Sequence, residues 1–318
     1  MSMRVMVTGG AGFIGSQLIL ALLAEGNDVV CVDNLDPYYD PALKRARLAR
    51  FEDRVVFYET DIADAKAFEA IFQKHPFDAV CHLAGQAGVL YSLKNPFIYG
   101  ESNVMGTLNV LEFSKRYKVP HVVYASTSSI YGENKPPFSE SDRVDTPVSI
   151  YAATKRAGEL LAYTYHHSFG LQTTALRFFT VYGPWGRPDM ALFKFVKNIL
   201  AGKPIDVYNN GDMRRDFTYV SDIVSGFMAA LKKPMGFEII NLGHGETVRL
   251  MDFVATIERE LGMKAKINFM PMQMGDVPVT HANPHKAKEL LGWEAHISVD
   301  EGIKNFIQWY REYYKISS

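Results

Sequence analysis

Residues 5–16, VMVTGGAGFIGS, decide the fold because they place glycines where a buried strand passes into a helix. Gly10, Gly12 and Gly15 fit the pattern G-x-G-x-x-G. Gly9 fits the alternative G-x-x-G-x-x-G with the same two later glycines. Glycine permits the tight turn, lets the backbone approach a pyrophosphate, and allows the helix to pack closely on the strand. The stretch therefore predicts the first βαβ unit of a dinucleotide-binding sheet.

The rest of the chain continues this alternation of strand and helix. Helical patterns such as 16–25, 64–73 and 104–117 separate β-rich apolar runs at 5–8, 29–33, 55–59, 79–83, 122–126 and 173–177. This rhythm predicts an α/β fold with a Rossmann-type doubly wound parallel sheet. Further helices are expected at 150–163, 217–233, 251–261 and 299–313.

Turn residues become frequent after residue 177, which indicates a change of architecture. We expect residues 1–177 to form the NAD-binding domain. Residues 178–318 would form mainly a smaller α/β domain for the substrate. A segment near 217–243 is expected to return to the first domain.

Composition excludes several classes of function. The chain has 318 residues, a formal net charge of -1 and 22% charged residues, so bulk charge does not favour nucleic acid or an anionic membrane. Cys31 and Cys81 lie in apolar runs and are interpreted as reduced core residues. Because the sequence enters a strand at once and has no apolar run of membrane-spanning length, we expect neither a signal peptide nor a membrane span. We expect a cytoplasmic protein without a metal site.

Asp33 indicates which dinucleotide is bound. It ends the second predicted strand, 18 residues after Gly15, and Asn34 rather than arginine follows it. A carboxylate there accepts hydrogen bonds from the adenosine ribose and repels a 2′-phosphate, which favours NAD over NADP. The alternative is a solvated acid at a strand end.

Tyr151 and Lys155 are the candidate catalytic pair. Their i, i+4 spacing places them on one face of the helix predicted over 150–163. A phenol ordinarily has a pKa of about 10, and a neighbouring ammonium and a positive nicotinamide both favour the phenolate. Tyr151 can then serve as general base near neutral pH, with the Thr127 hydroxyl bonded to the same substrate oxygen. A surface Tyr–Lys pair is the alternative.

These features together resemble the extended short-chain dehydrogenase/reductase family. Several further stretches are similar to nucleotide-sugar 4-epimerases, and most of all to UDP-glucuronate 4-epimerases: DNLDPYYDPALKRARL, HLAGQAGVLYSLKNP, ASTSSIYG, LRFFTVYGPWGRPDMA, RRDFTYVSD and QMGDVPVTHAN. The resemblance covers nearly the whole chain. It implies an isomerase that binds NAD and a UDP-sugar and forms a homodimer.

The resemblance also implies residue roles. The NAD phosphates would be held by Gly9, Gly12, Phe13, Ile14 and Gly15. At the adenosine ribose, the cofactor would contact Asp33, Asn34 and Lys44, and at the adenine it would contact Asp61 and Ile62. Leu83 and Ala84 would line the nicotinamide, and Asn103 would support the cofactor. Arg215 would pair with the UDP diphosphate and Asp276 with the uridine ribose. Arg187 would aid the substrate or order its own loop.

The implied reaction is a transient oxidation. Tyr151 takes the proton of the C4 hydroxyl while the C4 hydride passes to NAD. The 4-keto sugar then swings about its link to the diphosphate and receives the hydride on its other face. Because the UDP must stay fixed while the sugar moves, binding energy should lie on the nucleotide.

The stretch 121–134, HVVYASTSSIYGEN, ends a strand in Ser126, Thr127, Ser128 and Ser129. Related dehydratases and decarboxylases carry an acid directly after the position of Thr127, where this chain has Ser128. A 4-keto uronate is a β-keto acid that can lose CO₂. Neutral donors would hold its carboxylate away from the geometry that favours this loss: Thr127, Ser128, Ser129 and Thr180. Ser126 and Ser129 could instead serve only the strand-end backbone.

Three alternatives remain open. A UDP-glucose or UDP-N-acetylglucosamine 4-epimerase is favoured by Leu90, where the uronate family often has arginine, but not by Thr180, where neutral-sugar enzymes usually have asparagine. A UDP-glucuronate decarboxylase is disfavoured by Ser128. A non-catalytic NAD-binding regulator would not need Tyr151 and Lys155 together.

The helices expected at 104–117 and 151–167 are candidates for the dimer interface. Their apolar residues Leu108, Leu111, Leu160 and Leu161 could equally face the core.

Overall fold

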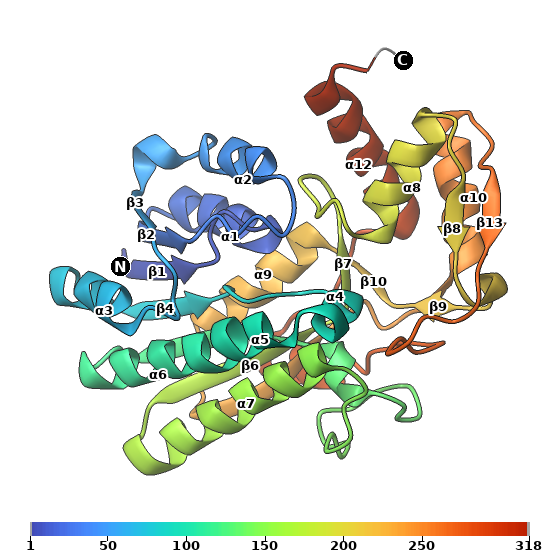
Figure 1. The fold of residues 1–318 in the computed structure, drawn as a ribbon. Helices are drawn as coiled ribbons and strands as arrows, with labels where there is room; N and C mark the ends of the chain where they lie inside the picture. Colours follow the sequence, from blue (N-terminus) through green and yellow to red (C-terminus); the bar gives the residue numbers. More distant parts are fainter. Residues whose placement is uncertain (1, 317–318) are drawn as a thin grey trace.

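The computed structural model describes residues 2–316 and contains a seven-stranded parallel sheet at its centre (Figure 1). The strand order is β11-β6-β5-β4-β1-β2-β3. The strands are β1 (Arg4–Thr8), β2 (Asp28–Asp33), β3 (Val56–Glu59), β4 (Ala79–His82), β5 (His121–Thr127), β6 (Gln172–Phe178) and β11 (Phe237–Leu242). The direction of winding reverses between β1 and β4, where open α/β sheets bind ligands. The predicted doubly wound fold is confirmed.

Helices cover both faces of this sheet. They are α1 (Phe13–Ala24), α2 (Pro41–Leu48), α3 (Ala65–Lys74), α6 (Gly106–Arg116), α7 (Ile150–Phe169) and α9 (Val220–Leu231). Val5 and Val7 of β1 face a core shared with α1 and α9, whereas Met6 faces a second core shared with α3, α6 and α7. Successive strand residues point to opposite faces, so a strand buried on both sides reads as a continuous apolar run.

A second group of elements lies beside the sheet, where Figure 1 shows α8, α10 and α12 together. Its helices are α8 (Ala191–Leu200), α10 (Leu250–Leu261) and α12 (Val299–Tyr314). Outside this group, α4 (Val89–Lys94) and α5 (Pro96–Tyr99) lie near α7, and α11 (His285–Leu291) contacts β11 and α9. The short strands pair as β7 (Thr180–Tyr182) with β10 (Phe217–Tyr219), β9 (Arg214–Arg215) with β12 (Val248–Arg249), and β8 (Ile205–Val207) with β13 (Ile267–Phe269).

Several predicted helices differ in extent from the observed ones, and the one expected at 16–25 is observed at Phe13–Ala24. The helix expected from residue 217 begins at Val220, because the buried Phe-Thr-Tyr before it forms β10, as suits β-branched and aromatic residues. The helix expected at 104–117 starts inside a π-helical turn, Gly100–Met105. The helix expected at 150–163 continues to Phe169 and is capped by Gly170, whose φ is 70°. The chain returns to the central sheet through β11, next to β6.

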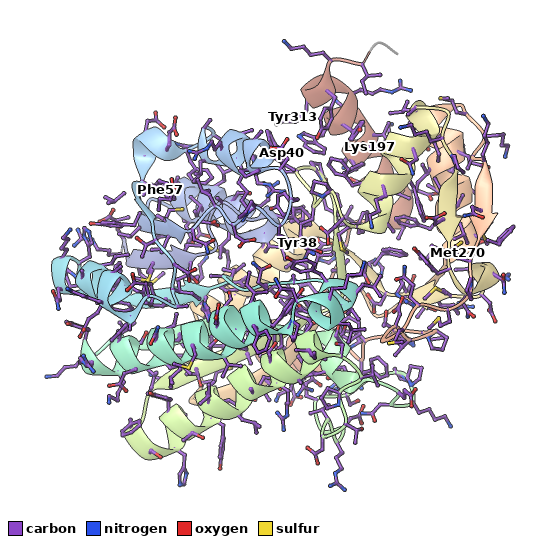
Figure 2. All side chains as sticks on the ribbon, in the orientation of Figure 1. Tyr38, Asp40, Phe57, Lys197, Met270 and Tyr313 are labelled. Carbon is purple, nitrogen blue, oxygen red and sulfur yellow. The ribbon has the colours of Figure 1, made fainter. Side chains whose placement is uncertain are left out.

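The loop before α8 is tied to α2. Arg47 of α2 is fully buried and donates hydrogen bonds to the carbonyl oxygens of Trp185 and Ala11. The Trp185 ring lies between the Arg50 guanidinium, 4.8 Å away, and the Tyr313 ring of α12, 5.1 Å away. Figure 2 shows Tyr313 near Asp40 at the start of α2, and Tyr38 in the middle of the molecule. Within residues 2–316, no helix combines the length and apolarity that crossing a membrane requires.

Candidate active site

A single cavity of about 780 Å³ brings the predicted site residues together at the carboxyl ends of the central strands. Of the predicted site residues, only Asn103 is not among those that line it. The lining set comprises Gly9, Gly12, Phe13, Ile14, Gly15, Asp33, Asn34, Lys44, Asp61, Ile62, Leu83, Ala84, Thr127, Ser128, Ser129, Tyr151, Lys155, Thr180, Arg187, Arg215 and Asp276.

The glycine turn has the close packing that a dinucleotide site needs. Gly9 has a φ of 71°, and its N–H donates to the Val32 carbonyl at 2.7 Å. A Cβ on Gly15 would lie 2.2 Å from the Gly9 carbonyl oxygen, so only glycine fits. Because α1 begins at Phe13 without a side-chain cap on Gly12, its first N–H groups are left for a phosphate. These residues fit the pyrophosphate of NAD.

Asp33 lines the cavity at the end of β2. Its carboxylate accepts hydrogen bonds from the Ala11 N–H at 3.0 Å and the Leu35 N–H at 2.9 Å, and the Lys44 ammonium lies 3.8 Å away. Asn34 donates to Asp61 at 3.0 Å. A carboxylate faces the place of a 2′-substituent, so the arrangement fits NAD better than NADP.

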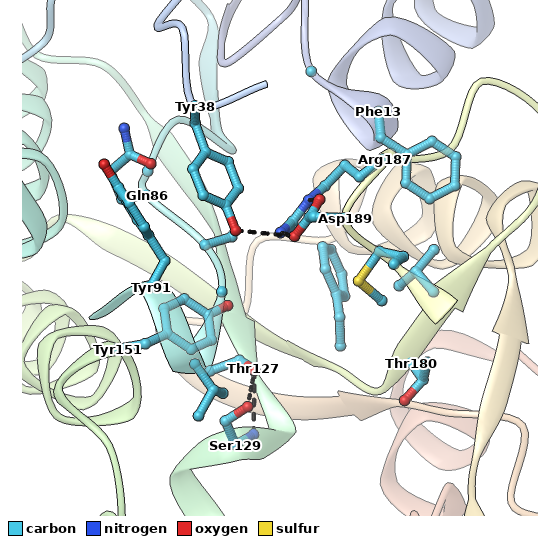
Figure 3. A pocket seen from close by; sticks show the side chains of 18 of the residues that line it. Phe13, Tyr38, Gln86, Tyr91, Thr127, Ser129, Tyr151, Thr180, Arg187 and Asp189 are labelled. Carbon is cyan, nitrogen blue, oxygen red and sulfur yellow. Dashed lines mark hydrogen bonds and ion pairs between the residues drawn. The ribbon is translucent and has the colours of Figure 1, made fainter. Parts of the chain in front are cut away.

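The catalytic candidates meet at the end of β5. Ser149 caps α7 by accepting the Ala152 N–H at 3.1 Å, which places Tyr151 in the first turn. Figure 3 shows the Tyr151 ring directed into the cavity beside Thr127. Lys155, one turn later, is 6% exposed.

The electrostatics of this pair differ in part from the expectation. Burial raises the pKa of Tyr151, although its hydrogen bond with Thr127 and the charge of Arg187 oppose the rise. Burial lowers the pKa of Lys155 to about 7, and the Glu159 carboxylate opposes this. The chain alone therefore keeps Tyr151 protonated near neutral pH, because desolvation outweighs its neighbours. A positive charge added by bound NAD would shift the balance toward the phenolate.

The four strand-end hydroxyls divide into two groups. Ser126 donates to the buried Glu159 carboxylate at 2.6 Å, so its hydroxyl is already used. Thr127 donates to the Ser129 hydroxyl at 3.2 Å and accepts from the Ser129 N–H at 3.1 Å, as Figure 3 shows. All four residues line the cavity, but only Thr127, Ser128 and Ser129 keep hydroxyls that are not bonded to Glu159, and Thr180 of β7 lies across from them in Figure 3.

Asn103 does not line the cavity but is hydrogen-bonded to a residue that does. It is 1% exposed and accepts the Gln86 N–H at 2.8 Å. Its amide donates to the Gln86 carbonyl and to Thr154 of α7, both at 3.0 Å. Asn103 thus holds the cavity-lining Gln86 against α7, as a support rather than a contact.

A second charged cluster spans the cavity. Arg187 donates to Asp189 through Nε at 3.0 Å and through Nη2 at 2.5 Å, and the Tyr38 hydroxyl also donates to Asp189 (Figure 3). Sequence reasoning assigned no role to Tyr38 or Asp189. It also missed other lining residues, among them Gln86, Tyr91 and Lys194. The spacing of Asp189 two residues after Arg187 was a usable signal for their ion pair.

The far end of the cavity holds another ion pair. Arg215 donates to Asp276 at 2.8 Å, and the Arg215 side chain is 15% exposed. The neighbouring Arg214 instead donates to Thr247 outside the lining set. A partly buried guanidinium that faces a cavity can bind a diphosphate through two parallel hydrogen bonds.

Comparison with known proteins identifies the relatives of this chain. It is 48% identical over 310 residues to the UDP-glucuronate 4-epimerase of Thermodesulfobacterium geofontis, with 96% of each chain covered. The UDP-glucuronic acid 4-epimerase of Bacillus cereus, solved with UDP-glucuronic acid and NAD, matches with a TM-score of 0.93 at 35% identity, covering 98% of this chain and all of that one. The UDP-glucose 4-epimerase of Thermotoga maritima, solved with UDP-glucose, matches with a TM-score of 0.91 at 32% identity over the same shares. Residues 5–243 match the NAD dependent epimerase/dehydratase family, and the chain belongs to that family.

Proposed function

We propose that this protein is a UDP-glucuronate 4-epimerase, an isomerase that interconverts UDP-glucuronate and UDP-galacturonate with NAD. The observation that carries the proposal is the end of β5. Tyr151 and Lys155 stand there beside three cavity-facing hydroxyls, and Ser128 occupies the place of a catalytic acid. The similarity to UDP-glucuronate 4-epimerases over nearly the whole chain supports the same conclusion.

Three residues carry the proton chemistry. Tyr151 removes the proton of the C4 hydroxyl and returns it after the sugar has turned. Thr127 donates or accepts a hydrogen bond at the same oxygen and keeps it within reach of the phenol. Lys155 stabilises the phenolate form by its charge. NAD, when bound, supplies the hydride acceptor and donor at C4.

A set of four hydroxyl groups would bind the C5 carboxylate of the uronic acid: those of Thr127, Ser128, Ser129 and Thr180. Neutral donors keep the carboxylate charged and hydrogen-bonded. They also fix its position, which holds the C5–carboxylate bond away from the perpendicular to the plane of the C4 carbonyl, where decarboxylation is favoured. Ser126 does not belong to this set, because its hydroxyl is bonded to Glu159.

The nucleotide would be anchored at the other end of the cavity. Arg215 would bind the diphosphate and Asp276 the uridine ribose, once their mutual ion pair yields to the ligand. In the domain division that we propose, residues 1–177 with the return segment near 217–243 bind NAD, and residues 178–318 bind mainly the nucleotide sugar. Anchoring UDP while the keto sugar turns is what the epimerisation requires.

Product analysis by NMR tests the proposal. Purified protein is incubated with UDP-glucuronate and with UDP-glucose in parallel, without added cofactor. Conversion of UDP-glucuronate alone to its C4 epimer, with no pentose product, is the expected result, and it also requires NAD that stays bound. Preferential conversion of UDP-glucose would overturn the uronate assignment.

A neutral-sugar 4-epimerase is the second candidate. Leu90 lines the cavity and is 39% exposed, so it offers no charge to a carboxylate. The match to the UDP-glucose enzyme of Thermotoga maritima supports the same candidate. The parallel incubation with UDP-glucose separates the two functions. Protein that holds NAD and converts neither sugar would favour a binding protein instead.

We further propose a cytoplasmic homodimer joined through α6 and α7. Leu160 of α7 is 52% exposed and Tyr163 is 50% exposed, so this helix presents apolar surface. Of the other predicted contacts, Leu111 is buried in the core, and Leu108 and Leu161 pack partly against it. Light scattering on Leu160→Asp checks the proposal, and an unchanged dimer would contradict it.

A further inference from the structure

Lys155 is buried without an acidic partner of its own. Among residues 2–316, no ion pair joins it to a carboxylate. Glu159, one turn further along α7, is fully buried, but Arg177 binds it through two hydrogen bonds of 2.9 Å. Arg156 donates to the same carboxylate at 3.0 Å. The charge of Glu159 favours the Lys155 ammonium, but two guanidinium groups share that carboxylate, so a second favourable neighbour of the ammonium matters.

That neighbour is the ring of Tyr124 in the middle of β5. The Lys155 nitrogen lies 4.5 Å from the centre of this ring, and Tyr124 is 2% exposed. The face of an aromatic ring attracts a cation, by about 2 kcal/mol or more where water is excluded. Because both Lys155 and Tyr124 are buried, the attraction between them falls at the strong end of this range.

The surroundings hold the Tyr124 ring in one orientation. Its hydroxyl donates to the Lys155 carbonyl at 3.2 Å, and a Cβ on Gly158 would lie 2.5 Å from the hydroxyl oxygen. The Tyr124 ring also stacks on the His82 ring, with ring centres 5.4 Å apart and planes 26° apart. His82 is fixed in turn by Thr8 at 2.8 Å and Thr107 at 3.0 Å.

The ring is not shared with a second cation. Burial lowers the pKa of His82 to about 3, and the charge of Lys155 lowers it further, so the imidazole below the ring stays neutral. The other charged or titratable groups around Lys155 are Glu159, Arg156 and Tyr151 of α7 and Arg177 of β6. The two arginines and Glu159 offset one another in part, and the Tyr124 ring is a direct contact of the ammonium.

We propose that Tyr124 is a positioning residue for the epimerisation: the face of its buried ring holds the Lys155 ammonium, charged and in place, beside Tyr151. Tyr124 does not touch the reacting atoms and acts only through Lys155. The inference rests on the proposed function for its catalytic meaning, but the ring–ammonium contact exists independently of the substrate.

The test replaces Tyr124 by phenylalanine, by phenylalanines with increasing ring fluorination, and by leucine. Fluorine withdraws charge from the ring face while the shape of the side chain is nearly kept. The protonation of Lys155 is followed without sugar, by NMR of protein with ¹³C at the lysine ε carbons, and Lys155→Met identifies the signal.

We expect Lys155 to titrate in Tyr124→Phe with nearly the same midpoint pH as in the original protein. Each added fluorine should lower the midpoint, and full fluorination or leucine should lower it by about one pH unit, a ten-fold change in the protonation equilibrium. The alkaline limb of turnover on UDP-glucuronate should move by the same amount while KM changes little. The same fluorinated residue at Phe227, a buried ring of α9 that is not among the cavity-lining residues and has no lysine or arginine over it in the described chain, should change neither.

A midpoint that is the same for phenylalanine and its fluorinated forms would overturn the proposal. The fluorinated series keeps the test decisive even if Tyr124→Leu does not fold. Because the titration uses no sugar, a shift in midpoint without turnover of UDP-glucuronate would contradict the proposed function alone.

Discussion

The Tyr38 hydroxyl donates a 3.1 Å hydrogen bond to the Asp189 carboxylate across the cavity. Tyr38 stands in the loop after β2, and Asp189 stands just before α8, so the bond joins the cofactor side to the substrate side. Asp189 also binds Arg187 through both carboxylate oxygens. Burial, followed by the charge of Asp189, raises the pKa of Tyr38 to about 12, so the hydroxyl keeps the proton that it donates at neutral pH.

Tyr38→Phe should therefore weaken the closure of the cavity without changing its chemistry. A hydrogen bond to a charged acceptor contributes about 1.5–3 kcal/mol, and part of it would be lost. We expect KM for UDP-glucuronate to rise by about ten-fold, while kcat stays within about two-fold. Steady-state kinetics measure both.

Tyr91→Phe is the matched control. Tyr91 lines the same cavity and its ring centre is 4.8 Å from that of Tyr38, but its hydroxyl only accepts a 3.3 Å bond from Asn95. The control should keep its KM. An unchanged KM in Tyr38→Phe would show that the bond is not formed in the working enzyme.

Tyr151→Phe should keep the binding of NAD and UDP and lose most turnover. The substitution removes the proton acceptor and leaves the ring, and general acid–base catalysis contributes about 10²–10⁴-fold. Calorimetric titration with UDP checks binding, and NMR of the products checks turnover. Full activity would contradict the assignment of Tyr151 as the base.

Ser128→Glu should divert part of the flux toward decarboxylation. The new carboxylate would stand beside Thr127 and repel the uronate carboxylate that neutral hydroxyls otherwise hold. The expected result is CO₂ release above the original protein together with a UDP-pentose product. Ser126→Ala is the control, since the Ser126 hydroxyl is directed to Glu159 and should not affect the ratio of products. No additional CO₂ would contradict our account of the hydroxyl set.

The parts of the site that the sequence predicts are those set by spacing along the chain. The glycine turn, Asp33 at the end of β2 and the Tyr151–Lys155 pair each depend on one element and its immediate neighbour. Parallel strands bring their carboxyl ends to one edge, so the fold alone gathers these residues at one cavity.

The parts that it does not predict depend on contacts between distant segments. Tyr38 and Asp189 are separated by 151 positions, and nothing local indicates that they meet. Ser126 and Thr127 are neighbours with similar side chains, yet strand alternation turns Ser126 toward Glu159. The pKa of Tyr151 also escaped prediction, because its rise depends on burial that only the tertiary structure provides.

Lys155→Met should stabilise the folded protein at pH 7. Burial lowers the pKa of Lys155 from 10.5 to about 7, so between these values the unfolded chain holds a proton that the folded protein does not. The free energy of unfolding due to this residue therefore falls as the pH falls from about 10.5 to about 7. Methionine has a similar shape and no charge, so the gain should be on the order of 2–4 kcal/mol at pH 7 and should shrink toward pH 10.

Urea unfolding at pH 7 and pH 9.5 measures the gain and its pH dependence. Lys194→Met is the control, because Lys194 of α8 lines the same cavity but is exposed, and its removal should change stability little at either pH. Equal stability of Lys155→Met and the original protein at pH 7 would mean that the contacts of the ammonium offset its desolvation in full. A gain at pH 7 that shrinks at pH 9.5 would instead show that Lys155, on which the proposed catalysis depends, lowers the free energy of unfolding.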